Sequence, residues 1–311
     1  YEVMMTPHSS SPMAIFGFVY AWYLMAVLLL ELWLDYRRDL VVWSREARGV
    51  KRFIYRAMTL GVMDVSEEAV RFDERAGRFV TIVGIPSAFL LHGYVGFIFG
   101  SVKANPWWGT VLMPVIFIFS AMVSGIALMA FLYVVVSKIR RVPVDLACLE
   151  TITTVLFSAL LVDASLESLD WIHRLYEAEE SIDVLVLLAS GKLQYSFLLV
   201  QVGLGTATPL VVLGALLAFK NRLSVAVRKW ACFLCSILII VGVFAMRWNV
   251  VIGGQLFSKS LRGFTTYKLE LIGQEGVLAA AILMAAPFVI LAVLMWLFLP
   301  AKAKAAASCA R

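Results

Sequence analysis

Charged residues are scarce in this chain, and residues that often carry chemistry are few. Only 15% of the 311 residues are Asp, Glu, Lys or Arg, and there are three histidines and four cysteines. A soluble domain has about 25% charged residues, so this chain has too little charge for an ordinary water-exposed surface. The cysteines, Cys148, Cys232, Cys235 and Cys309, are too few and too scattered for a disulfide framework.

Apolar residues take the place of the missing charge. They make up 62% of the chain, and the mean hydropathy is +0.89. A membrane helix needs about 20 mainly apolar residues, and seven segments meet this condition: Met13–Leu34, Phe79–Gly100, Thr110–Val136, Ala147–Glu167, Gln194–Phe219, Lys229–Val250 and Val277–Leu299. These runs do not alternate with period two, which excludes a β-barrel. We predict an all-α, polytopic membrane protein with about seven transmembrane helices packed in helical bundles.

Lys and Arg residues predict the orientation of these helices. Loops on one side hold twenty of them, within 35–78, 137–146, 219–229 and the tail from 300 onward. Loops on the other side hold six, within 1–12, 101–109, 168–193 and 251–276. The positive-inside rule places the first side in the cytoplasm. We therefore expect a multi-pass protein of the cell membrane with a cytoplasmic C-terminus, and topology accounts for the net charge of +6 without nucleic acid.

Three of the loops are long. The segment 35–78 is predicted to be a polar cytoplasmic loop, either a solvated helix pair near lipid headgroups or a docking surface for a cytoplasmic subunit. The segments 168–193 and 251–276 are predicted to be extracytoplasmic. Apolar residues 182–190 cover only about half a membrane span, so they are expected to lie at the interface or against the bundle.

Ionisable residues inside membrane spans are costly and therefore mark candidate functional sites. The candidates, together with a polar neighbour and a lysine just beyond one span, are His92, Asp163, Glu167, Arg247, Asn249 and Lys103. Asp163 and Glu167 are four residues apart and share one face of their helix. All the helices concerned run outward, so these groups lie toward the outer face of the membrane.

This placement suits oxidation of a quinol, which releases two protons and two electrons. His92, Asp163 and Glu167 are the candidate catalytic groups, because histidine needs the least tuning to act as a base near neutral pH. His92, Lys103, Arg247 and Asn249 are the candidates for binding the quinone headgroup. Structural alternatives remain: His92 bonded to a backbone carbonyl, a carboxylate paired with Arg247, or Arg247 extended toward the interface.

Haem and metal sites are poorly supported. His8 and His173 lie outside the spans, which leaves His92 as the single intramembrane histidine, whereas a membrane haem b usually takes two. Cys232 and Cys235 form a CxxC inside a membrane helix without further ligands nearby. We expect no haem, iron–sulfur cluster or metal held by this chain alone, so a partner must accept the electrons.

Four motifs resemble the NrfD/PsrC family, the polytopic quinone-interacting subunits of respiratory complexes. They are GIPSAFLLHGYVGFIFGSVKANPWW at 84–108, LMPVIFIFSAMVSG at 112–125, LESLDW at 166–171 and MRWNVVIGGQ at 246–255. The resemblance covers most of residues 10–300 and is strongest to the ten-helix branch of the family, which contains DsrP of the DsrMKJOP complex and HmeB.

The resemblance implies two four-helix bundles with flanking helices, a single NrfD-like transmembrane domain over 1–311, and about three helices upstream of Tyr1. It also implies a non-covalent menaquinone or ubiquinone site in the first bundle near the outer face, where His92 would act. The implied partners are an extracytoplasmic ferredoxin-like iron–sulfur subunit, a haem b membrane subunit and a cytoplasmic heterodisulfide-reductase-like subunit.

These observations lead to one expected function and two alternatives. We expect a subunit of a menaquinol oxidoreductase complex in sulfur or sulfite metabolism, itself without a redox cofactor, that exchanges electrons between menaquinol and the iron–sulfur partner. A purely structural anchor is the first alternative. A proton-translocating or transport protein is the second, and it would predict an inverted repeat with sites at the midplane.

Overall fold

Long helices account for almost all of the described chain. The computed structural model describes residues 8, 11–177, 182–258, 263–266, 270–272 and 276–298. Their helices are α2 (Pro12–Ala21), η1 (Trp22–Leu28), α3 (Leu29–Glu46), α4 (Val50–Met58), α5 (Glu67–Gly100), α6 (Met113–Arg140), α7 (Leu146–Glu177), α8 (Ile182–Ser190), η2 (Gln194–Ala207), α9 (Thr208–Ala218), α10 (Val225–Trp248), η3 (Asn249–Gly253) and α11 (Val277–Phe298). The three η segments are π-helical turns. The all-α prediction is confirmed.

Joined where they are continuous, these elements form seven helices in the described residues that are long and apolar enough to cross a membrane, as predicted. Several extend beyond the predicted spans. α5 begins at Glu67 rather than near Phe79, and α7 runs on to Glu177 rather than ending near Glu167. Backbone hydrogen bonding continues past the apolar stretch because a helix ends where its packing and capping end, not where the hydrocarbon ends. The predicted C-terminal tail from 300 onward and Cys309 lie outside the described residues.

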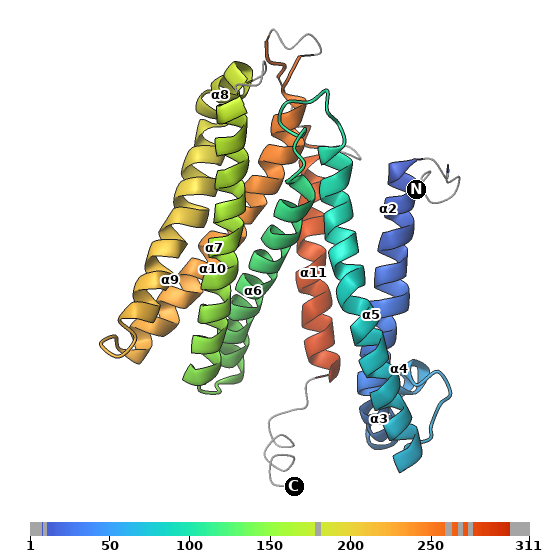
Figure 1. Cartoon of the computed structure of the whole chain (residues 1–311). Coiled ribbons are helices and arrows are strands. Elements are labelled where there is room, and N and C mark those ends of the chain that lie inside the picture. The colour runs from blue at the N-terminus through green and yellow to red at the C-terminus, as the bar shows by residue number, and fades with distance from the viewer. Residues whose placement is uncertain are drawn as a thin grey trace. The chain divides into compact units, whose positions relative to one another are not determined.

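The chain forms two compact units, which are described separately. Unit 1 comprises Tyr1–Leu28 and Thr81–Thr265, and unit 2 comprises Leu29–Val80 and Thr266–Arg311. In unit 1, α6, α7, α10 and the continuous pair η2–α9 form a four-helix bundle, because α10 packs on η2 and α6, and α7 packs on α6 and α9 (Figure 1). This set of helices is called the bundle below.

The two ends of the bundle differ in their connections. The loop 101–112, α8 and the segment after η3 gather at one end, and the short loops after α6 and α9 lie at the other (Figure 1). The first end is the one that the charge pattern predicts to face outward, and it is called the outer end. An apolar core joins all the helices of the bundle: Val123, Ala127, Leu156, Leu160, Leu213, Leu216, Cys235 and Ile239.

Glycines allow two close helix contacts that position the site. η2 meets α10 at Gly205 and Gly242, and a Cβ built on either residue would overlap the Cα of the other. α5 meets the start of α6 at Gly96, where a Cβ would lie 2.6 Å from the Cα of Pro114. Small residues at such crossings let backbones approach, which is how membrane helices gain packing energy without a hydrophobic driving force.

Unit 2 contains a charged group that the sequence placed in water. Arg37 is 1% exposed, its Nε donates to Asp73 Oδ2 at 2.7 Å, and its Nη1 donates to the carbonyl of Asp64 at 2.5 Å. Tyr55 of α4 donates to the carbonyl of Leu297 at 2.7 Å, and burial raises the pKa of its hydroxyl. The segment 35–78 therefore forms packed helices with buried polar contacts, rather than a wholly solvated helix pair.

Candidate functional site

A chain of polar side chains crosses the bundle between α7, η2 and η3. Gln201 Nε2 donates to Glu167 Oε2 at 3.1 Å, and Asn249 Nδ2 donates to Gln201 Oε1 at 2.9 Å. One amide therefore joins a carboxyl group of α7 to a second amide at the end of α10. Asp163 lies one turn before Glu167 on α7 and is 5% exposed.

Local backbone geometry helps to present these groups. Gln201 lies within η2, and Asn249 is the first residue of η3, so both amides come from π-helical turns. In η2 the hydroxyl of Thr206 donates to the carbonyl of Gln201 at 3.1 Å, and Pro209, which cannot donate a backbone hydrogen bond, follows soon after. Wide π turns are uncommon and often occur at functional sites.

Arg247 lies near both carboxyl groups but is held by α6. Its Nη2 donates to Ser120 Oγ at 2.8 Å and to the carbonyl of Phe117 at 3.1 Å, and its guanidinium carbon lies 3.8 Å from the centre of the Phe117 ring. It interacts electrostatically with Asp163 and Glu167, yet it forms no ion pair with either among the described residues within 4.0 Å. The ion pair considered from the sequence is replaced by a hydrogen-bonded cation–π contact.

Two oxygen atoms in this region lack a partner. Asp163 Oδ1 and Asn249 Oδ1 are buried and accept no hydrogen bond from the described residues. Asn249 as a whole is only 1% exposed. Leaving a buried acceptor unsatisfied costs about 1–3 kcal/mol, so such atoms in a folded protein call for a water molecule, a proton or a function.

A small internal cavity adjoins the polar chain. Its volume is about 60 Å³, and its lining includes Glu167, Gln201, Asn249, Asp170 and Arg174, with apolar and aromatic side chains around them. Roughly 10–15 Å³ measured in this way holds one water molecule, so the cavity has room for a few. It is far smaller than the roughly 300–1,000 Å³ of small-molecule pockets. The cavity therefore suits water and does not fit a quinone ring.

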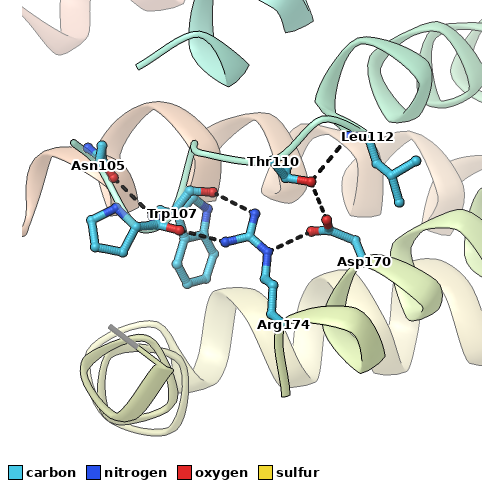
Figure 2. A network of polar contacts seen from close by, with 7 residues as sticks. Asn105, Trp107, Thr110, Leu112, Asp170 and Arg174 are labelled. Carbon is cyan, nitrogen blue, oxygen red and sulfur yellow. Dashed lines mark hydrogen bonds and ion pairs between the residues drawn. The ribbon is translucent and has the colours of Figure 1, made fainter. Parts of the chain in front are cut away.

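A second polar network, which includes Asp170 and Arg174 of the cavity lining, joins α7 to the loop 101–112 (Figure 2). Arg174 Nε donates to Asp170 Oδ2 at 3.0 Å, and its Nη1 donates to the carbonyl of Pro106 at 2.5 Å. Thr110 Oγ1 donates to the other oxygen of Asp170 and accepts from the backbone of Leu112 at 3.2 Å. Asp170 and Arg174 are buried, and both carboxylate oxygens are satisfied.

The loop 101–112 is tied across this end. Asn105 Nδ2 donates to the carbonyl of Gly254 at 2.7 Å, and Trp108 Nε1 donates to the carbonyl of Val250 at 2.6 Å. Trp107 packs edge-on against Trp171 and Phe197, at ring separations of 5.9 and 5.7 Å. The loop thereby holds the carbonyl groups that receive Arg174.

His92 and Lys103 stand apart from the polar chain. His92 is half-buried on α5, its Nδ1 lies 3.0 Å from the carbonyl of Ala88, and it does not line the internal cavity. Lys103 is exposed in the loop 101–112. Of the six residues predicted from the sequence, the structure brings together Asp163, Glu167, Arg247 and Asn249, and it leaves His92 and Lys103 outside that group.

Sequence reasoning missed Gln201, Ser120, Asp170 and Arg174. The prediction was built on ionisable groups inside spans, with Asn249 and Lys103 added as neighbours, and it placed Asp170 and Arg174 in the loop 168–193. A usable signal was present, because Asp163, Glu167, Asp170 and Arg174 recur at helical spacing, so the helix could have been extended.

Metal and thiol chemistry finds little support in the described part of the chain. Cys232 and Cys235 are buried free thiols, and Thr153 Oγ1 donates to Cys232 Sγ at 3.4 Å. Within the described ranges, three or more His, Cys, Asp or Glu side chains do not come together in a way that could hold a metal ion.

Comparison with known proteins places this arrangement in a family. The chain is 34% identical over 129 residues to one of the subunits of the selenate reductase of Mesobacillus selenatarsenatis. The match covers 39% of this chain and spans only 30% of that relative's length. The family model described as polysulphide reductase, NrfD, matches residues 1–259, which is most of the chain and includes the whole bundle. With its apolar helices and buried polar chain, the protein belongs to the NrfD family of quinone-interacting, multi-pass membrane proteins.

Proposed function

We propose that this protein is the quinone-interacting membrane subunit of a respiratory redox complex, in which it exchanges electrons with an extracytoplasmic iron–sulfur partner and handles the accompanying protons. The observation that carries the proposal is a buried, incompletely paired carboxyl–amide chain in a member of the NrfD family. Buried ionisable groups in membrane proteins are usually functional. The similarity to a reductase subunit supports a role in a redox complex.

His92 is the proposed binding residue for the headgroup. If Nδ1 donates its hydrogen to the carbonyl of Ala88, Nε2 is left as an acceptor, because the partner of one ring nitrogen sets the role of the other. An acceptor is what a hydroquinone hydroxyl requires. Phe89, one turn before His92 on α5, is an exposed apolar side chain within the membrane span, which suits contact with a ring or prenyl tail. These residues fit a quinone, whereas the internal cavity of the bundle does not.

The remaining candidates take separate roles in this proposal. A quinol supplies two electrons and two protons when it is oxidised. Asp163 and Glu167 would receive protons inside the bundle, and Arg247 with Asn249 would stabilise them electrostatically and by hydrogen bonding. Lys103, exposed in the outer loop, would contact the headgroup region or the partner. We keep menaquinone as the proposed quinone.

The partners and setting are also proposals. An extracytoplasmic ferredoxin-like subunit would dock at the outer end, with a haem b subunit in the membrane and a heterodisulfide-reductase-like subunit in the cytoplasm. Sulfur metabolism, close kinship with DsrP or HmeB, and a cytoplasmic C-terminus complete the proposal. The twenty basic residues in the loops of one predicted side support this orientation.

The test compares His92→Ala with a matched histidine variant in the intact complex. Quinol-dependent reduction of the partner should fall by about 100-fold in His92→Ala, the usual size of a lost acid–base contribution. His8→Ala, which changes an exposed histidine before the first helix, should leave the rate within about twofold. An unchanged rate in His92→Ala would instead favour the structural-anchor alternative.

A further inference from the structure

We propose that Asp163 and Glu167 form a proton-binding site that exchanges protons with one side of the membrane only, through water in the internal cavity, and that the Asp170–Arg174 pair gates this exchange. The inference deepens the proposed function and rests on it for the use of the protons. It concerns the bundle, and it does not depend on where a quinone binds.

The two residues of the proposed gate line both the internal cavity and a crevice at the molecular surface. Besides the internal cavity of about 60 Å³, a crevice of about 510 Å³ lies at the outer end, lined by Thr110, Leu112, His173, Glu177 and neighbouring residues. Asp170 and Arg174 line both spaces. Their side chains therefore form the wall between the water-sized cavity and the open crevice.

Two buried oxygen atoms without a partner among the described residues can accept hydrogen bonds from a water molecule. Asn249 is 1% exposed, lines the cavity and has an Oδ1 without a partner among the described residues. Asp163 Oδ1 is also buried without a partner. A water molecule in a polar cavity of this size would normally make about three hydrogen bonds, and Asn249 on the cavity lining offers an acceptor for one of them.

At the opposite end of the bundle a smaller cavity of about 20 Å³ is lined by Glu150, Lys220 and Arg228 among others. The apolar core lies between this cavity and Asp163. Leu156 and Leu160, two turns and one turn before Asp163, belong to the apolar core that joins all the helices of the bundle. The hydroxyls of Thr154 and Ser158 lie on the exposed face of α7 and donate to the carbonyls of Glu150 and Thr154. The polar stripe in this part of α7 thus satisfies its own helix.

Proton movement through the cavity needs no other reactant. A water molecule in the cavity donates a proton to a carboxylate oxygen, forming an O–H bond, and takes a replacement from the next water toward the crevice. The charged groups around Asp163 and Glu167 are Arg247 of α10 and the Asp170–Arg174 pair of their own helix, while α6 and η2 contribute the neutral Ser120 and Gln201. Rotation of Arg174 away from Asp170 would join the cavity to the crevice.

Time-resolved infrared spectroscopy after a pH jump tests this on the full chain in oriented lipid vesicles. Carboxyl bands that disappear in Asp163→Asn and in Glu167→Gln should respond to a jump on the crevice side and not to one on the opposite side. In Arg174→Gln the response should be about tenfold faster, which corresponds to lowering the barrier by about 1.4 kcal/mol. Arg222→Gln, in the exposed loop after α9, is the matched control and should respond at the unchanged rate.

A second variant covers the case in which Arg174→Gln does not fold. Asp170→Asn combined with Arg174→Gln removes both charges together, avoids a stranded charge and should also respond about tenfold faster. Equal response from both sides overturns the one-sided site. Equal rates in the wild type and the gate variants overturn the gate. If these results hold while His92→Ala leaves quinol oxidation unchanged, the proton site stands and the quinone assignment falls.

Discussion

Two pairs of side chains on α7 have the same spacing and opposite characters. Asp170 and Arg174 are four residues apart, carry opposite charges and satisfy each other and the loop 101–112. Asp163 and Glu167 are also four residues apart but carry like charges, and one oxygen of Asp163 has no partner in the described residues. The nearest cation, Arg247, is bound to α6.

This difference indicates that the Asp170–Arg174 pair is a structural contact, whereas the Asp163–Glu167 pair can take part in proton transfer. A buried ion pair with its remaining hydrogen bonds satisfied has no reason to exchange protons, and removing one partner strands a charge. A carboxyl pair supported by neutral amides can take up or release a proton without breaking the fold. The first pair should therefore control stability and the access of protons to the interior, and the second should bind the protons that activity requires.

The largest effect should come from breaking the opposite-charge pair. Asp170→Ala leaves the buried guanidinium of Arg174 without its carboxylate, and it should lower the free energy of unfolding by about 3–5 kcal/mol. Denaturant unfolding in detergent measures this. Asp183→Ala, which removes an exposed carboxylate at the start of α8, should cost less than about 1 kcal/mol. Similar losses in the two variants would show that the pair is not structural.

The second-largest effect is expected at the like-charge pair of Asp163 and Glu167. Asp163→Asn keeps the size of the side chain and removes an incompletely paired carboxyl group, so the free energy of unfolding should be unchanged or higher. Quinol-dependent reduction should slow about 100-fold, because the proton acceptor is lost. Both quantities are measured on the intact complex. If Asp163→Asn lowers the free energy of unfolding but keeps the full rate of quinol-dependent reduction, then Asp163 is a structural group and not a proton acceptor.

A smaller loss should follow when the amide bridge is removed. Gln201→Leu strands Glu167 Oε2 and Asn249 Nδ2 inside the bundle, and it should cost about 1–3 kcal/mol in unfolding free energy. The matched control is Gln194→Leu, since Gln194 is exposed at the start of η2. If the control costs as much, the bridge contributes nothing specific.

The smallest effect should come from the contact of Arg247 with α6. Ser120→Ala removes one of its hydrogen bonds but leaves the carbonyl and ring of Phe117, so a loss of about 0.5–1.5 kcal/mol is expected in thermal or denaturant unfolding. Ser124→Ala, where the hydroxyl bonds only to the carbonyl of Ala121, should cost less. A loss as large as that of Gln201→Leu would give Ser120 a larger role than its contact with Arg247 explains.

The transmembrane helices were predictable in number and position because their signal is local. Each apolar run of sufficient length must form a helix in lipid, and all seven were confirmed among the described residues. Their ends were not predictable to the same degree. The extension of α7 to Glu177 moved Asp170 and Arg174 from an expected loop onto a helix, where they became buried.

The candidate site was predictable only in part. From their depth along each helix, Asp163, Glu167, Arg247 and Asn249 were predicted to lie toward one end of the bundle, and in the structure these four lie near one another. A single sequence does not give the rotation of each helix about its own axis. The contacts of Ser120 with Arg247 and of Gln201 with Glu167 could therefore not be predicted. For the same reason Arg37, expected in a solvated segment, is buried against Asp73.

The sequence by itself determined that this chain is a multi-pass membrane protein and which segments form its long apolar helices, because hydrocarbon acts on each segment separately. The tertiary structure alone decided which polar groups meet. Glu167 and Gln201 are 34 positions apart, and Ser120 and Arg247 are 127 apart. Such contacts depend on how helices pack and rotate against one another, and this is a property of the whole bundle rather than of any one span.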